Sequence, residues 1–190
     1  MILKIPSATP NETDAAQYII RNGKNQYNLC GEFCVAYCLQ DETHTDTIDE
    51  FLDYWQAKNL KWYQTLFPNG IGRTTSIYDL KRMIEEYEYP PPSLLFSGLP
   101  VNPYVIQATL NDYQAIVGVQ IDHAGYLVGR GIYHWVVLDA INVVDKLHSI
   151  VYIYNPFTNN IEPYSWREFM TSTGAYKNGL WIKRSLEKQS

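Results

Sequence analysis

The 190-residue sequence has no stretch approaching ~20 consecutive apolar residues, the length with which an α-helix crosses a bilayer. Its first ten residues, MILKIPSATP, lack the long apolar core of a secretory signal. We therefore expect a soluble, cytoplasmic protein without a membrane segment. The chain also lacks a run of basic residues: 15 Lys and Arg stand against 20 Asp and Glu, for a formal net charge of −5. A phosphate backbone is bound by clustered positive charge, so we expect no nucleic-acid partner.

Cysteine is scarce. Only three are present, and all fall within nine residues, at Cys30, Cys34 and Cys38. An odd, clustered count does not make a disulfide framework. Zinc sites use CxxC-like pairs or added histidines at short spacing, which this cluster lacks, so we expect no metal and no other cofactor.

What the sequence does contain is typical of one globular α+β domain. Hydrophobic residues make up 46 % and charged residues 18 %, and at about 150 residues per domain the length favours a single domain over residues 1–190. Patterns before the Pro90-Pro91-Pro92 run are helical, and those after it are rich in Val, Ile and Tyr, which predicts an antiparallel sheet. We expect a helical lobe over about 11–90 and a β lobe over about 91–185. The expected helices are Asp14–Arg21, Cys30–Gln40 and segments opened by Thr47-x-x-Glu50, Ser76-x-x-Asp79 and Ser165-x-x-Glu168, and the expected strands are Ala115–Ile121, Ile132–Val144, Ser149–Tyr154 and Leu180–Ile182.

The cysteines occupy one stripe of a predicted helix, because residues four apart are neighbours on a helix surface. Cys30 follows a polar, loop-like segment and therefore marks the helix N-terminus. The positive end of the helix dipole there favours a thiolate, which is the nucleophilic form. Buried cysteine also behaves as a small hydrophobe, and Cys30 alone leaves both interpretations open. Cys34 and Cys38, which lie deeper in the helix, are expected to pack in the core.

A cysteine nucleophile needs a base and a group that orients the base. Of four histidines, His134 stands out because it lies at the start of an apolar strand directly after Gly129-Arg130-Gly131. A buried core histidine is the alternative. If the following hairpin turns at Asp145-Lys146, paired positions sum to 291 and Asn155 shares a face with His134. The two side chains are then diagonal neighbours, with Cα atoms roughly 7–8 Å apart.

Three short motifs resemble the papain-like cysteine peptidases. They are Asn28-Leu29-Cys30-Gly31-x-x-Cys34, His134-Trp135-Val136-Val137 and Tyr154-Asn155-Pro156, in that order and spread over about residues 26–157. The arrangement is most similar to the compact bacterial branch that includes double-glycine leader peptidase domains. The resemblance implies a helical lobe carrying the thiol and a β lobe carrying the base.

Carried over residue by residue, the resemblance implies Cys30 as nucleophile, His134 as base and Asn155 as its orienting group. Family members place an oxyanion-stabilising Gln about six residues before the nucleophile, where this chain has Lys24. Gln26 is the expected donor instead, with Asn25 and Asn28 as substitutes. The expected substrate-binding residues are Gly31, Tyr133 and Trp135, and the expected partner is a peptide or protein substrate.

Two other functions stay open at this point. An acyltransferase would use the same acyl-enzyme and pass it to an amine or a thiol. A non-catalytic papain-like module would bind peptides, which the sixteen tyrosines favour because tyrosine supplies amphipathic contact area. The loops Gly70–Thr75 and Phe96–Pro103 are candidate elements around a substrate cleft, the second as a lid.

Overall fold

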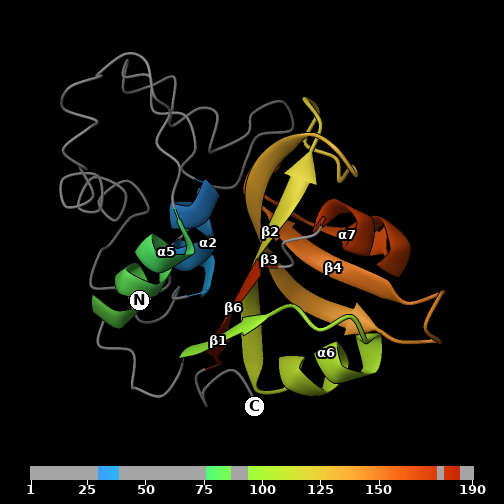
Figure 1. Cartoon of the computed structure of the whole chain (residues 1–190), viewed down its shortest axis with the longest axis horizontal. Coiled ribbons are helices and arrows are strands. Elements are labelled where there is room, and N and C mark those ends of the chain that lie inside the picture. The colour runs from blue at the N-terminus through green and yellow to red at the C-terminus, as the bar shows by residue number, and fades with distance from the viewer. Residues whose placement is uncertain (1–29, 39–75, 87–93, 175–177, 185–190) are drawn as a thin grey trace. The chain divides into compact units, whose positions relative to one another are not determined.

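The computed structural model describes residues 30–38, 76–86, 94–174 and 178–184 (Figure 1). The chain divides into two compact units, one formed by Met1–Tyr89 with Pro156–Asn159 and the other by Pro90–Asn155 with Asn160–Ser190. The α+β class is confirmed, and the expected helical and β lobes stay a prediction. That the chain is a single domain stays a prediction.

The described part of the first unit contains two helices in contact with each other, α2 (Cys30–Cys38) and α5 (Ile77–Glu86). A capping box begins α5, as predicted: the Asp79 amide donates to Ser76 Oγ at 3.3 Å, and the Ser76 amide donates to Asp79 Oδ2 at 2.9 Å. The helices expected at 14–21 and 47–57 and the loop 70–75 lie outside the described residues. Buried side chains of the two helices are Cys30, Phe33, Cys34, Val35, Cys38, Leu80, Met83 and Ile84.

The second unit is built on a six-stranded sheet in which every neighbouring pair is antiparallel, in the order β1-β6-β2-β3-β4-β5. All four predicted strands are present. Helix α6 packs against β2 and β3, and α7 packs against β2, β4 and β5. The elements are β1 (Leu94–Gly98), α6 (Pro103–Leu110), β2 (Tyr113–Ile121), β3 (Ile132–Asn142), β4 (Ile150–Asn155), β5 (Asn160–Ser165), α7 (Trp166–Ser172) and β6 (Asn178–Lys183).

Three elements of this unit were not expected, and one expectation is wrong. The segment Phe96–Pro103 is not a lid loop, because its first three residues belong to β1, which pairs along its length with β6. Its last residue, Pro103, is the first residue of α6, where a missing N–H costs no helical hydrogen bond. Asn102 caps that helix by accepting from the Tyr104 amide at 3.0 Å. The third unexpected element is β5, an edge strand that contains Pro163.

A β-bulge at Asp139 sets the register between β3 and β4. Next to the connecting loop, Asn142 pairs with Ile150, and the paired numbers sum to 292. Beyond the bulge, Val137 pairs with Tyr154, and the sum is 291. Asp139 is thus the extra residue on β3. One further step along the same register brings Asn155 opposite Val136.

Arg184 and Gln114 hold the bulged residue from the neighbouring part of the sheet. Arg184 Nη2 donates to the Asp139 carbonyl at 2.7 Å, and its Nε donates to the carbonyls of Leu110 and Tyr113 at 3.1 and 3.2 Å. Gln114 Nε2 donates to Asp139 Oδ1 at 3.5 Å. A bulge interrupts the hydrogen bonds between strands, and at this bulge the Arg184 side chain donates to the Asp139 carbonyl.

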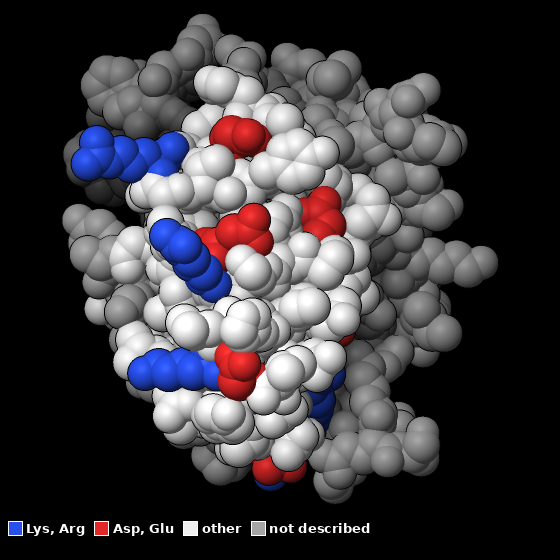
Figure 2. Space-filling model, turned by 90° about the vertical axis from the view of Figure 1, so that its right-hand side faces the viewer, with Lys and Arg blue, Asp and Glu red and all other residues white. Residues whose placement is uncertain are grey.

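The surface of the second unit carries charges of both signs. On the face in Figure 2, the described Lys and Arg side chains are interspersed with Asp and Glu and separated by larger uncharged areas. Within the described ranges, the structure has no helix that is both long and apolar enough to span a membrane.

Candidate functional site

The ring of His134 and the amide of Asn155 meet at one end of the β3–β4 pair. His134 is on β3, Asn155 is the last residue of β4, and His134 Nε2 lies 2.9 Å from Asn155 Oδ1. Both residues are buried, with exposed fractions of 6 % and 0 %. The structure therefore joins the two residues that sequence reasoning had paired.

The Asn155 amide is held in one orientation by two acceptors. Its Nδ2 donates to the Gly125 carbonyl at 3.0 Å and to Glu162 Oε2 at 3.1 Å. A carbonyl and a carboxylate only accept hydrogen bonds, so the NH₂ end of the amide faces them and Oδ1 faces His134. Oδ1 in turn only accepts. The ring nitrogen that meets it, Nε2, must carry the proton, and in the neutral imidazole Nδ1 then carries the lone pair.

The turn between β2 and β3 places the Gly125 carbonyl. Asp122 Oδ1 accepts from the amides of Ala124 and Tyr126 at 2.9 and 3.0 Å, which closes the turn. Gly125 has a φ of 91°, a conformation that glycine adopts without steric cost. The turn Asp122-His123-Ala124-Gly125 thereby positions the buried Gly125 carbonyl to accept a hydrogen bond from the Asn155 side chain.

Burial controls the protonation of His134. Loss of solvent lowers the pKa of His134 from 6.5 to about 4, while the hydrogen bond to Asn155 and the charge of Glu162 act in the opposite direction. The ring is consequently neutral at pH 7. A neutral imidazole with a lone pair on Nδ1 is in the form that can accept a proton.

This buried histidine predicts a specific loss of stability in acid. Between pH 6.5 and about 4 the unfolded chain binds a proton at His134 that the folded protein does not, so the free energy of unfolding falls as the pH falls through that window. At about 1.4 kcal/mol per pH unit, the loss reaches about 3 kcal/mol near pH 4. Urea unfolding of the wild type and of His134→Gln across this range isolates the contribution. We expect His123→Gln, a change at an exposed position, to keep the wild-type slope.

Glu162 and Tyr164 belong to the same network and were missed by sequence reasoning. Both lie on β5, and Tyr164 Oη donates to Glu162 Oε2 at 2.8 Å. Burial and the Glu162 hydrogen bond raise the pKa of Tyr164, so its hydroxyl remains a donor. Residues two apart point to the same face of a strand. The sequence could therefore have placed Glu162 and Tyr164 side by side only if residues 160–165 had been predicted as a strand.

Cys30 lies in the first unit, as the first residue of α2. All three cysteines of α2 are thiols, and all three are buried, with exposed fractions of 8 % for Cys30, 0 % for Cys34 and 6 % for Cys38. Core positions for Cys34 and Cys38 are confirmed. Gly31, next to Cys30, is buried as well. Gln26, the expected oxyanion donor, lies outside the described residues, as do Asn25 and Asn28.

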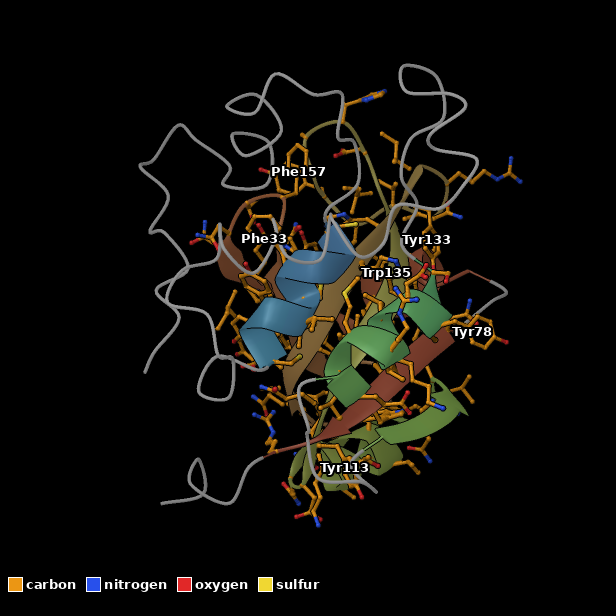
Figure 3. All side chains as sticks on the ribbon, turned by 90° about the vertical axis from the view of Figure 1, so that its left-hand side faces the viewer. Phe33, Tyr78, Tyr113, Tyr133, Trp135 and Phe157 are labelled. Atoms are coloured by element: carbon orange, nitrogen blue, oxygen red, sulfur yellow. The ribbon has the colours of Figure 1, made fainter. Side chains whose placement is uncertain are left out.

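Tyr133 and Trp135 flank His134 in sequence but point to the other face of β3, because side chains alternate along a strand. Their rings pack edge to face, with centroids 5.3 Å apart and an interplanar angle of 84° (Figure 3). Trp135 is buried, whereas Tyr133 is 46 % exposed. A Cβ on Gly118 would overlap the Tyr133 hydroxyl, so the absence of a side chain at Gly118 leaves the space that the Tyr133 ring occupies. Of the two, Tyr133 offers the accessible surface.

Two further histidines are positioned as expected. His123 is exposed in the β2–β3 turn, and exposed His148 pairs through Nδ1 with Asp145 Oδ2 at 2.7 Å. His44 lies outside the described residues. No group of three or more His, Cys, Asp and Glu side chains in the described ranges is arranged to hold a metal ion.

Comparisons with known proteins supply no family for this chain. No family model, no curated protein and no solved structure matches it.

Proposed function

We propose that the chain is a papain-like cysteine peptidase or amidase, with Cys30 as nucleophile, His134 as base and Asn155 as the residue that orients His134. The observation that carries the proposal is the His134–Asn155 hydrogen bond of 2.9 Å, with the amide locked by two acceptors. A base held in one tautomer and one orientation is what a thiol nucleophile requires.

The proposed reaction runs through Nδ1 of His134. Nδ1 takes the proton of the Cys30 thiol, and the thiolate sulfur adds to the carbonyl carbon of the substrate. When the resulting oxyanion collapses, the C–N bond breaks and Nδ1 returns its proton to the departing amine. An incoming water then loses a proton to Nδ1 while its oxygen attacks the acyl-enzyme, and the thiol is regenerated with release of the carboxylic acid.

The remaining roles follow the sequence motifs. Gln26 and the Cys30 amide would donate to the oxyanion, a contribution worth ~10²–10³ in rate per donor. Gly31 leaves room for the substrate beside the nucleophile. Tyr133 and Trp135 would contribute to substrate binding, the first through its half-exposed ring and the second by packing edge-on against it.

Thiol reactivity tests the proposal. Because a helix N-terminus and, in the proposed mechanism, the base His134 favour the thiolate, iodoacetamide near neutral pH is expected to modify Cys30 well before the other two cysteines of α2. Peptide mapping by mass spectrometry after timed quenching gives the three rates in one sample, and Cys34 and Cys38 serve as internal controls. Equal, slow labelling of all three would reject an enzymatic function and favour a peptide-binding module.

The same preparation distinguishes hydrolysis from acyl transfer. Incubation with peptide pools, with and without added amines, yields products that differ in mass. Hydrolysis adds one water to the cleaved bond in both samples. Acyl transfer produces new amides only when the amine is present.

A further inference from the structure

Glu162 stands directly behind the Asn155 amide. The β4–β5 register pairs Asn155 with Asn160 and Ile153 with Glu162, so Asn155 and Glu162 share one face as diagonal neighbours. Glu162 Oε2 accepts two hydrogen bonds there, from Asn155 Nδ2 at 3.1 Å and from Tyr164 Oη at 2.8 Å. The carboxylate is therefore fixed from one side by its own strand and linked on the other side to the amide that holds His134.

The oxygen and the NH₂ group of the Asn155 side chain have nearly the same shape, but the oxygen accepts hydrogen bonds and the NH₂ group donates them. Rotating the Asn155 amide by 180° would turn Oδ1 toward the Glu162 carboxylate and the Gly125 carbonyl, where acceptor would face acceptor. The same rotation would bring Nδ2 to His134 Nε2 and favour the tautomer that carries its proton on Nδ1. The tautomer of His134 thus depends on what stands behind Asn155.

Glu162 also contributes charge. A carboxylate near an imidazole favours the imidazolium, and Glu162 raises the pKa of His134 against the larger effect of burial. The titratable groups around this network in the described residues are Tyr164, which donates to Glu162, and Tyr126, which acts on Tyr164. The imidazolium is the form that passes a proton to a leaving amine, so the carboxylate supports the acid half of the cycle.

We propose that Glu162 is a positioning residue that sets the tautomer and the basicity of His134 through the Asn155 amide. The catalytic significance of this role rests on the proposed peptidase function. The arrangement itself lies entirely within β3, β4, β5 and the β2–β3 turn, so it can be measured without an activity assay.

The test replaces Glu162 by glutamine and follows the His134 ring nitrogens by ¹⁵N NMR in the full chain. Gln retains the size of Glu but removes the charge and offers a donor as well as an acceptor to Asn155. We expect the wild-type ring to carry its proton on Nε2 at pH 7. In Glu162→Gln we expect an increased Nδ1–H fraction and a lower pKa of His134. Tyr164→Phe, which removes a donor to Glu162, should shift the tautomers in the same direction by less.

Glu168→Gln is the matched control. Glu168 is an exposed residue in the capping box of α7, so Glu168→Gln makes the same chemical change far from His134 in the hydrogen-bond network. Either Glu or Gln can complete a capping box. Unchanged His134 tautomers and pKa in a folded Glu162→Gln variant would overturn the inference.

Kinetics separate the two proposals. If the chain is a peptidase, Glu162→Gln lowers kcat with little change in KM and moves the acid limb of the pH profile. If the wild type has no amidase activity yet Glu162→Gln alters the His134 ring, the peptidase proposal fails and the positioning role of Glu162 stands.

Discussion

Cys30→Ser is expected to abolish amide hydrolysis, with a loss on the order of 10³-fold or more. A serine hydroxyl gives up its proton far less readily than a thiol, and a neutral His134 is a weak base for removing it. The substitution changes one atom and leaves the helix backbone intact. Peptide cleavage followed by mass spectrometry, together with the disappearance of the rapid alkylation at residue 30, measures the effect.

Cys34→Ser is the control for Cys30→Ser. Cys34 lies one helical turn further along α2 and is fully buried, so the same chemical change there costs at least as much stability. Activity close to that of the wild type in Cys34→Ser, with thermal unfolding recorded for both variants, assigns the loss in Cys30→Ser to chemistry. Equal losses in the two variants would contradict a nucleophilic role for Cys30.

His134→Gln is expected to lower kcat by about 10²–10⁴-fold. Glutamine can still donate from Nε2 to Asn155 Oδ1, so the link between β3 and β4 is retained while the titratable nitrogen is lost. The pH profile provides a second measurement, because the limb that reports the ionisation of His134 disappears with the residue. Steady-state kinetics on a peptide substrate from pH 4 to 8 measures both effects.

His148→Gln controls for the loss of any histidine from the second unit. His148 lies in the loop that joins the same two strands, but its ring is exposed and bonded to Asp145. We expect its kcat and pH profile to match those of the wild type. If His134→Gln retained wild-type kcat, His134 would be a buried core histidine and not a base.

Elements with a strong local pattern were predicted well from the sequence. Strands β2, β3 and β4 are rich in β-branched and aromatic residues, and the capping boxes at Ser76 and Ser165 mark the starts of α5 and α7. The elements that were missed have weak or conflicting local signals. Pro163 argued against β5, and β1 is a short strand that exists through its pairing with β6. For α6 the signal was present, since Asn102-Pro103 is an N-cap followed by proline at N1.

The shared face of His134 and Asn155 was predicted correctly, but the assumed turn is not the one observed. A tight turn at Asp145-Lys146 gives paired numbers that sum to 291. The loop actually spans residues 143–149, and the pairing beside it sums to 292. Only the bulge at Asp139 restores the predicted register at the site. Gly125 and Glu162 could not be assigned from local patterns, because each reaches Asn155 through tertiary structure.

The bulge also determines where this hairpin tolerates changes in chain length. Residues added to or removed from the 143–149 loop lie beyond the bulge, so the pairing of Val137 with Tyr154 can survive them. Deleting Asp139 would only remove the extra residue, because Leu138 would stay opposite Ile153 and Val136 opposite Asn155. Deleting Val136, which lies between the bulge and His134, would instead bring Trp135 opposite Asn155 and turn the His134 ring to the other face of the sheet. A change of chain length is therefore compatible with the site in the loop and at the bulge residue, and incompatible with it in the strand between the bulge and His134.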